Sequence, residues 1–150
     1  MGRALGDVRV RRIGRQLLFN IPVDVANALG LKPGMTFRVK SKDNERLVLE
    51  HGEGPTRIIL GGRSILRLAI DETIAPFKEG DRLLVMAGDN ELILQKIDYY
   101  IVKVSKKEKS YYRVNIPWEL AEMTGLIRFD KVKIRSDGNK IVIEPLDLGR

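Results

Sequence analysis

One block of sequence occurs twice in this chain, and that internal repeat restricts the folds that the chain can adopt. Asn20-Ile21-Pro22 opens a short helical pattern that ends at Leu29-Gly30-Leu31, and Asn115-Ile116-Pro117 opens a similar pattern that ends at Gly125-Leu126. Each copy then continues into two strand-like segments joined by a polar turn. A repeated unit of this size cannot bury its apolar face alone, so we expect the copies to share cores.

Each outer copy is predicted to run strand, basic turn, strand, short helix, strand, turn, strand. The alternation of apolar and charged residues at Val8-Arg9-Val10 is typical of a half-buried strand. Pro22 is placed at a helix start, where its missing N–H costs nothing, and Gly30 is placed at the helix end. Asp137-Gly138 predicts a hairpin turn in the last copy. The predicted fold class is therefore mostly β with short helices.

The segment between the two copies is a degraded version of the same unit. Residues 77–85 align with residues 31–39, but only six residues separate Ile70 from Phe77, which leaves no room for the helix. Gly52-Glu53-Gly54-Pro55 is expected to be a linker. The chain therefore divides into three β-strand-rich repeats, at residues 1–51, 52–98 (helix-less) and 99–150.

Positive charge is concentrated in the two outer repeats. Residues 1–51 carry ten Lys and Arg against five Asp and Glu, and residues 99–150 carry eleven against seven, whereas residues 52–98 carry six against eight. Arginines crowd the first basic turn, and lysines crowd the corresponding turn of the last repeat. Clustered cations favour a polyanionic partner over general solubility.

The order and spacing of these motifs resemble the AbrB/MazE/SpoVT family, the swapped-hairpin β-barrel DNA-binding proteins of bacteria and archaea. The matching motifs are Gly14-Arg15, Ile21-Pro22, Leu29-Gly30-Leu31 and Lys32-Pro33-Gly34 in the first repeat, and Ile116-Pro117 and Gly125-Leu126 in the last. The last repeat departs from the family by carrying Lys109-Ser110 in place of Gly-Arg. The resemblance implies that two repeats interlock their hairpins and close one barrel.

The resemblance further implies a DNA-binding protein, either a transcriptional regulator or a chromatin-associated factor, that grips duplex DNA through the first strand of a repeat and its turn. Carried over by position, it nominates Arg9, Arg11, Arg12 and Arg15 in the first repeat, and Lys103, Lys106, Lys107, Lys109 and Arg113 in the last. Arginine forks can read guanine edges, whereas lysine suits phosphates, so the first repeat is expected to contact bases and the last to follow the backbone.

An odd number of repeats cannot pair within one chain, so the sequence predicts a homodimer. In the favoured arrangement, the two basic repeats pair within the chain and the middle repeats pair across the dimer. In the alternative, the first and middle repeats pair within the chain, and the third repeat makes the dimer contact.

Other functions are compatible with the same residues. Basic turns also occur as solvated faces that keep strand edges from aggregating. A protein-interaction adaptor would use the acidic middle repeat as its docking face, and an antitoxin of the MazE kind would need a longer tail than the five residues after Pro145. Trp118 is expected to pack beside Pro117, and the tyrosines are expected to pack rather than to stack on bases.

Catalytic and metal-binding patterns are absent from the sequence. The chain has no cysteine and one histidine, His51, which excludes thiolate sites and histidine clusters. The neighbouring carboxylates Asp71 and Glu72 would point to opposite sides of a strand. We therefore expect a non-enzymatic protein without a cofactor or metal. No stretch approaches the roughly 18 apolar residues of a membrane span, so we expect a cytoplasmic, nucleoid-associated protein with no membrane partner.

Overall fold

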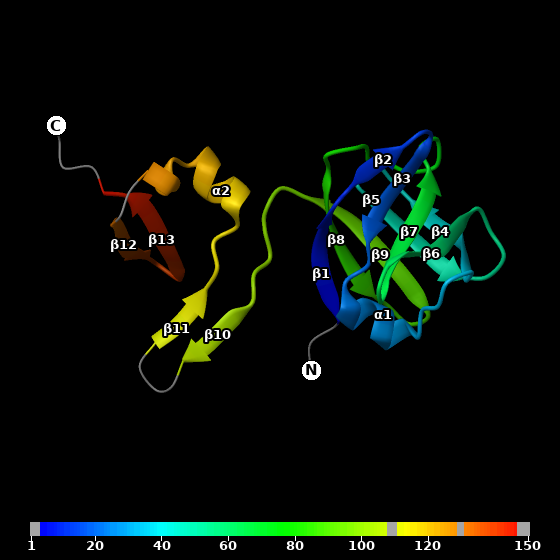
Figure 1. Cartoon of the computed structure of the whole chain (residues 1–150), viewed down its shortest axis with the longest axis horizontal. Helices are drawn as coiled ribbons and strands as arrows, with labels where there is room; N and C mark the ends of the chain where they lie inside the picture. Colours follow the sequence, from blue (N-terminus) through cyan, green and yellow to red (C-terminus); the bar gives the residue numbers. More distant parts are fainter. Residues whose placement is uncertain (1–3, 108–110, 129–130, 147–150) are drawn as a thin grey trace. The chain divides into compact units, whose positions relative to one another are not determined.

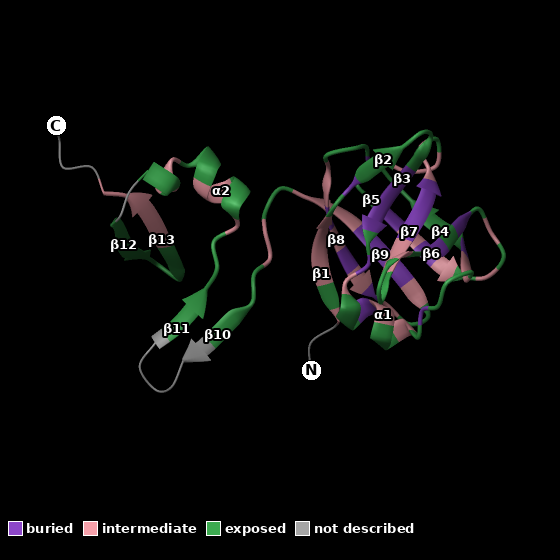
Figure 2. Ribbon diagram, viewed as in Figure 1, coloured by how far each residue is buried: buried purple, intermediate pink, exposed green. Residues whose placement is uncertain are grey.

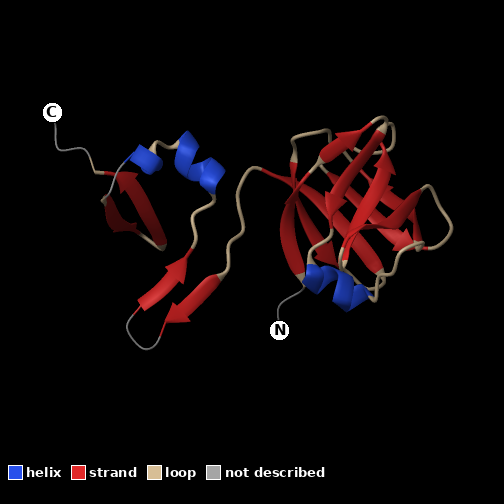
Figure 3. Ribbon diagram, viewed as in Figure 1, coloured by secondary structure: helices blue, strands red, loops and turns tan. Residues whose placement is uncertain are grey.

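The computed structural model describes residues 4–107, 111–128 and 131–146, and the chain forms two compact units, Met1–Ile101 and Val102–Arg150 (Figure 1). Strands dominate both units, and the helices are short (Figure 3). The predicted fold class, mostly β with short helices, is confirmed. None of the helices in the described ranges is long and apolar enough to cross a membrane.

The first unit is an antiparallel, barrel-like sheet of nine strands. The strands are β1 (Leu5–Arg9), β2 (Arg11–Ile13), β3 (Gln16–Asn20), β4 (Thr36–Lys42), β5 (Arg46–His51), β6 (Thr56–Gly62), β7 (Ile65–Asp71), β8 (Arg82–Ala87) and β9 (Glu91–Ile97). Their order in the sheet is β1-β8-β9-β5-β4-β6-β7-β3-β2. Only Val10 separates β1 from β2 along the chain, so the two ends of this order meet and the sheet nearly closes on itself.

Alternating side chains of these strands fill the inside of the barrel. Leu17 and Phe19 of β3 and Leu47 and Leu49 of β5 are among the buried residues (Figure 2). Helix α1 (Val23–Leu29) lies across one end, where Val25 is fully buried. As predicted, this helix begins directly after Pro22 and ends at Gly30, which has left-handed backbone geometry.

The strands of the first repeat pair with those of the middle repeat. β1 pairs with β8, β3 with β7, β4 with β6 and β5 with β9, all antiparallel. The expectation that the first and third repeats share one barrel within the chain is therefore wrong. The short connection from β5 to β6 keeps the middle repeat close to the first at a low entropic cost, and β6 pairs with β4, the neighbour of β5 in the sheet.

These strand pairs show an internal two-fold symmetry. If β1 and β2 are exchanged with β6, β3 with β7, β4 with β8 and β5 with β9, the set of strand pairs is unchanged. The first and middle repeats therefore use equivalent strands to hold each other.

Individual hydrogen bonds follow the same symmetry. The Gly34 N–H donates to the Ile58 carbonyl at 2.8 Å, and the Gly80 N–H donates to the Val10 carbonyl at 2.9 Å. Ile58 and Val10 in turn donate to the carbonyl of the residue after each glycine, at 2.8 and 2.9 Å. Gly34 and Gly80 have φ angles of 93° and 91°, which few other residues adopt.

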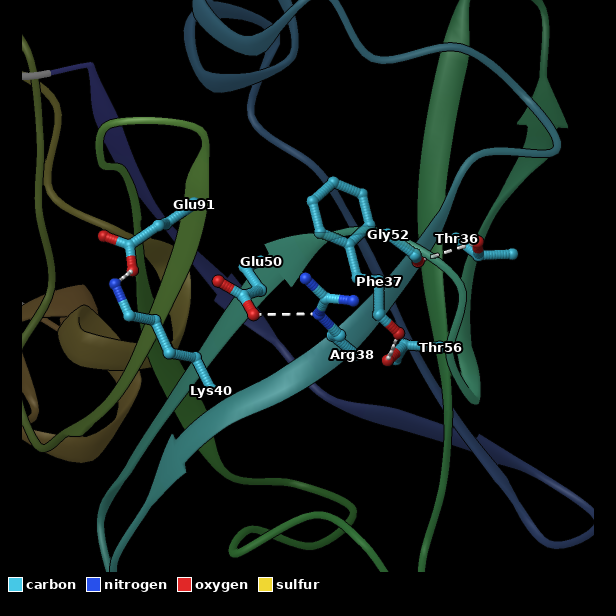
Figure 4. A network of polar contacts seen from close by, with 8 residues as sticks. All are labelled: Thr36, Phe37, Arg38, Lys40, Glu50, Gly52, Thr56 and Glu91. Atoms are coloured by element: carbon cyan, nitrogen blue, oxygen red, sulfur yellow. Dashed lines mark hydrogen bonds and ion pairs between the residues drawn. The ribbon is translucent and has the colours of Figure 1, made fainter.

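The expected linker after β5 is instead a packed turn. The Gly52 N–H donates to the Thr36 carbonyl at 3.1 Å, and a side chain at Gly54 would clash with the Phe37 carbonyl. The Thr56 hydroxyl, which is fully buried, donates to that same Phe37 carbonyl at 3.0 Å (Figure 4). The glycines here allow close approach of two backbones rather than flexibility.

In the middle repeat, a turn occupies the place of the missing helix, as predicted. One Asp71 carboxylate oxygen accepts hydrogen bonds from the Thr73 N–H at 2.9 Å and from the Thr73 hydroxyl at 2.6 Å. These bonds favour the charged carboxylate and lower the pKa of Asp71 below its usual value.

The second unit has the element order of the first repeat, but its described strands form two separate two-stranded sheets. Its elements are β10 (Val104–Lys107), β11 (Tyr111–Val114), α2 (Trp118–Met123), the 3₁₀ helix η1 (Leu126–Arg128), β12 (Val132–Asp137) and β13 (Lys140–Pro145). β10 pairs only with β11, and β12 only with β13, among the strands described. No residue of this unit with a described side chain is buried, and Trp118, which was expected to pack, is exposed.

Candidate nucleic-acid interface

A groove opens on the outer face of the barrel at the seam where the sheet ends meet. β1 pairs with β8 and β2 pairs with β3, so the chain bends at Val10 between two neighbours. The resulting groove has a volume of about 680 Å³ and is lined by β1, β2, β3 and β7, together with Glu79. A bend in one strand therefore produces a concave surface lined by several arginines.

Four arginines converge on this groove: Arg9, Arg11, Arg12 and Arg67. Two carboxylates, Asp7 and Glu79, also line it. Arg82 donates to Asp7 at 2.7 Å, so the negative charge of Asp7 is already balanced by an ion pair with Arg82. The groove keeps an excess of positive charge, which suits an anionic ligand.

Strand register brings Arg67 to the arginines of the first strand. Asn20 of β3 pairs with Arg67 of β7, and the Arg67 side chain donates to the Asn20 side-chain oxygen at 3.0 Å. Arg11 pairs with Leu18 on the other side of β3. Three strands thus place Arg11, Asn20 and Arg67 on one outer face. Arg11 forms no ion pair among the described residues, so its guanidinium is available to a ligand.

The turn between β2 and β3 lies beside two carboxylates. Arg12 forms an ion pair with Glu72 at 3.3 Å, and the Glu72 N–H donates to the Arg15 carbonyl at 2.9 Å. Arg15 also contributes to the lowered pKa of Asp71, after the larger effect of the Thr73 hydrogen bonds. Asp71 and Glu72, which looked unrelated to any site, therefore compete for the cations of the basic turn.

The residues nominated in the last repeat belong to the second unit, whereas the groove belongs to the first. Lys103 is exposed and precedes β10, Lys106 and Lys107 lie in β10, and Arg113 is exposed in β11. Lys109 lies outside the described residues. The pair β10–β11 corresponds to β2–β3, so Lys106, Lys107 and Arg113 lie on strands equivalent to those beside the first basic turn.

A second hollow on the barrel, of about 480 Å³, carries Lys40, Lys42 and Arg46 on β4 and β5. Its Lys40 ammonium is held by Glu91 at 2.7 Å, and the hydrogen bond raises the pKa of Lys40 (Figure 4). This hollow has three cations, the same number that Arg9, Arg11 and Arg67 contribute to the first groove. It therefore provides a charge-matched comparison for experiments.

The sequence nominated Arg9, Arg11 and Arg12, which line the groove, but it did not nominate Arg67, which lines it as well. The available signal was weak: Arg67 alternates with Leu66 and Leu68, which marks it as pointing outward, but says nothing about its neighbours. Only the register of β7 against β3 places Arg67 next to Asn20.

No family model, curated protein or solved structure matches this chain. Within the described ranges, no group of three or more His, Cys, Asp or Glu side chains gathers as a metal site would require. His51 is exposed at the end of β5, with its ring 5.6 Å from the ring of Phe37.

Proposed function

We propose that this chain is a DNA-binding protein, acting as a transcriptional regulator or a chromatin-associated factor. The observation that carries the proposal is the arginine-lined groove at the barrel seam. Arg9, Arg11 and Arg67 come from separate strands and converge on one face, where guanidinium forks can bind phosphate oxygens in pairs. Because the barrel already holds these strands in place, DNA binding costs little conformational entropy of the backbone.

We also propose that the chain is built from three related repeats, the first two interlocked as swapped hairpins. The two-fold exchange of strand pairs and the matched bonds of Gly34 and Gly80 support this. Under this view the groove belongs to the first repeat, and the β10–β11 hairpin of the third repeat offers a second, lysine-rich contact that follows the DNA backbone.

The test is the salt dependence of binding to mixed-sequence duplex DNA. Each phosphate neutralised contributes about −0.9 to the slope of log affinity against log salt. Changing Arg9, Arg11 and Arg67 together to Gln is expected to weaken binding and to flatten the slope by roughly 2 to 3. The charge-matched control changes Lys40, Lys42 and Arg46 to Gln, and is expected to keep most of the affinity and slope.

Two results would contradict the proposal. One is a wild-type chain that does not bind DNA at low salt, which would favour the protein-adaptor function. The other is an equal loss in both triple variants, because this would mean that net charge, rather than the groove, determines binding.

A further inference from the structure

Arg67 differs from the other arginines of the groove in how its side chain is held. Arg67 is half-buried, whereas Arg9, Arg11 and Arg12 are exposed. It belongs to β7, which lies between β3 and β6 in the sheet (Figure 1). Contacts with both of these neighbouring strands hold its side chain.

On the side of β3, Asn20 fixes the direction of the Arg67 guanidinium group. Arg67 Nε donates to Asn20 Oδ1 at 3.0 Å, and the two residues are direct register partners. The bond uses only Nε, so it does not consume the donors on the two terminal nitrogens. Both residues line the groove, so these donors are placed where a ligand would bind.

On the side of β6, Gly61 makes room for the Arg67 side chain. Gly61 is the extra residue of a β-bulge, since the register of β6 against β7 shifts between Leu60 and Gly62. A Cβ atom at Gly61 would lie 2.7 Å from Cγ and Cδ of Arg67 and 2.6 Å from its Nε. The arginine therefore lies directly against the glycine backbone, and a side chain at position 61 would displace it.

A guanidinium group that is held from two sides is suited to reading a base. A phosphate attracts any nearby cation, whereas a guanine edge has to be met by two donors in one fixed direction. Fixing a long side chain costs conformational entropy, and for Arg67 this cost falls on folding rather than on DNA binding. Arg11 is the contrasting case, because it is exposed and forms no ion pair among the described residues.

We infer that Arg67 determines base specificity in this chain by binding the O6 and N7 edge of a guanine in the major groove, with Asn20 and Gly61 as its positioning residues. The inference rests on the proposed function, because it concerns DNA bound at the same groove. It gives the middle repeat a role in the site, since β7 belongs to residues 52–98 and Asn20 to residues 1–51. The resemblance described above assigns no DNA contact to the middle repeat.

The first experiment identifies the bases that the full chain prefers. Wild type is mixed with duplexes that carry a randomised stretch, and the bound fraction is sequenced. We expect at least one position at which guanine is favoured over the other bases by about 5- to 150-fold. Arg67→Gln is expected to abolish this preference. Arg11→Gln is expected to keep it, to weaken binding to all sequences alike and to flatten the salt slope by about 1.

Two further variants move the Arg67 side chain without changing any charge. Asn20→Ala removes the bond to Nε, and Gly61→Ala displaces the side chain at a position whose φ is not left-handed, so the backbone accepts alanine. Both are expected to lose most of the guanine preference at the position that Arg67→Gln affects, and to keep the wild-type salt slope. Combined with Arg67→Gln, neither is expected to add a further loss there, because both act through Arg67.

Gly88→Ala is the matched control for Gly61→Ala. Gly88 lies directly after β8, and its φ is not left-handed either, but it does not line the groove. This variant is expected to keep both the guanine preference and the salt slope. A urea midpoint for each variant checks that the barrel is folded.

Failure of this inference is distinguishable from failure of the proposed function. If wild type binds DNA with a steep salt slope but Arg67→Gln leaves every base preference unchanged, Arg67 does not read a base, and the proposed function stands. If the guanine preference survives in both Asn20→Ala and Gly61→Ala, these two residues do not position Arg67. A wild-type chain that does not bind DNA at low salt would overturn the inference and the proposed function together.

Discussion

Arg12 and Arg15 belong to the basic turn, yet each lies next to a carboxylate of the middle repeat. Arg12 is paired with Glu72 at 3.3 Å, and Arg15 lies in the field of Asp71. A phosphate that binds this turn has to compete with these carboxylates. Arg11 forms no ion pair among the described residues, and Arg67 donates to the Asn20 amide oxygen rather than to a carboxylate, so we assign the main anion contact to the groove rather than to the turn.

Removing the competing carboxylate should strengthen DNA binding. Exposed ion pairs are worth about 0.2–1 kcal/mol, so Glu72→Gln is expected to raise DNA affinity by roughly 1.5- to 5-fold at low salt. Glu53→Gln, which removes one exposed negative charge from the turn after β5, is the control for net charge. Fluorescence anisotropy with a labelled duplex measures both. An equal gain in the two variants would mean that the ion pair with Glu72 does not weaken the binding of Arg12 to DNA.

The residues of the site were predictable to different degrees. Arg9, Arg11 and Arg12 could be nominated from the sequence because they are close together in one strand and turn. Arg67 could not, because its place in the groove depends on the pairing of β7 with β3, which local sequence does not encode. For the same reason, nothing in the sequence revealed that Glu72 would meet Arg12.

At the level of elements, β4, β5 and β9 contain an unfavourable pair that nearby cations relieve. Glu50 and Glu91 are direct register partners, and like charges in such positions destabilise a sheet. Arg38 binds Glu50 at 2.8 Å, and Lys40 binds Glu91 at 2.7 Å. Lys40 can reach Glu91 from a β-bulge, since the register shifts between Val39 and Ser41.

This arrangement predicts a pH dependence of stability. The bond to Glu91 raises the pKa of Lys40 above 10.5, so its stabilising effect is fully present below that value and is lost as the pH rises through the higher folded-state pKa. Urea midpoints of wild type and Lys40→Met are therefore expected to differ at neutral pH and to converge in strong alkali. Lys42→Met, on the same strand, is the control. A gap that persists in alkali would assign the effect of Lys40 to packing.

Most individual elements followed from sequence pattern, with failures at points of close packing. Pro22 and Gly30 bound α1 as predicted because helix ends depend on local chemistry. The linker prediction for Gly52-Glu53-Gly54-Pro55 was wrong because glycine allows both a flexible chain and a close approach of two backbones. Only the structure, in which Gly54 lies against the Phe37 carbonyl, shows that close approach is the reason here. The prediction that Trp118 packs beside Pro117 was wrong because the described residues of this unit form no buried core against which its ring could pack.

For the whole molecule, the internal sequence repeat predicted that repeats pair to share a hydrophobic core, but it did not identify which repeats pair. Sequence similarity favoured the first and third repeats, since both keep the helix and the basic turn. Connection length favours the first and middle repeats instead, because β5 leads into β6 through a turn of four residues. The strands of the middle repeat still pair fully, so the loss of its helix did not remove its ability to complete a barrel.

In the alternative arrangement that the sequence predicts, the third repeat makes a dimer contact, and such a dimer would join two groove-bearing barrels in one particle. Two linked sites bind one duplex more tightly than either alone, provided that the geometry allows both to engage. Ile141 of β13 is 78% exposed, whereas Leu47 in the matching hairpin of the first repeat is fully buried, so Ile141→Asp is expected to break this dimer. Affinity for a long duplex is then expected to fall about tenfold or more and the salt slope to flatten, although every groove arginine is unchanged. Met123→Asp should match wild type. On a duplex too short for two barrels the difference should shrink, since only one groove can then engage. If Ile141→Asp is monomeric but keeps the wild-type affinity and slope on long DNA, a single groove accounts for the binding, and dimerisation serves another purpose.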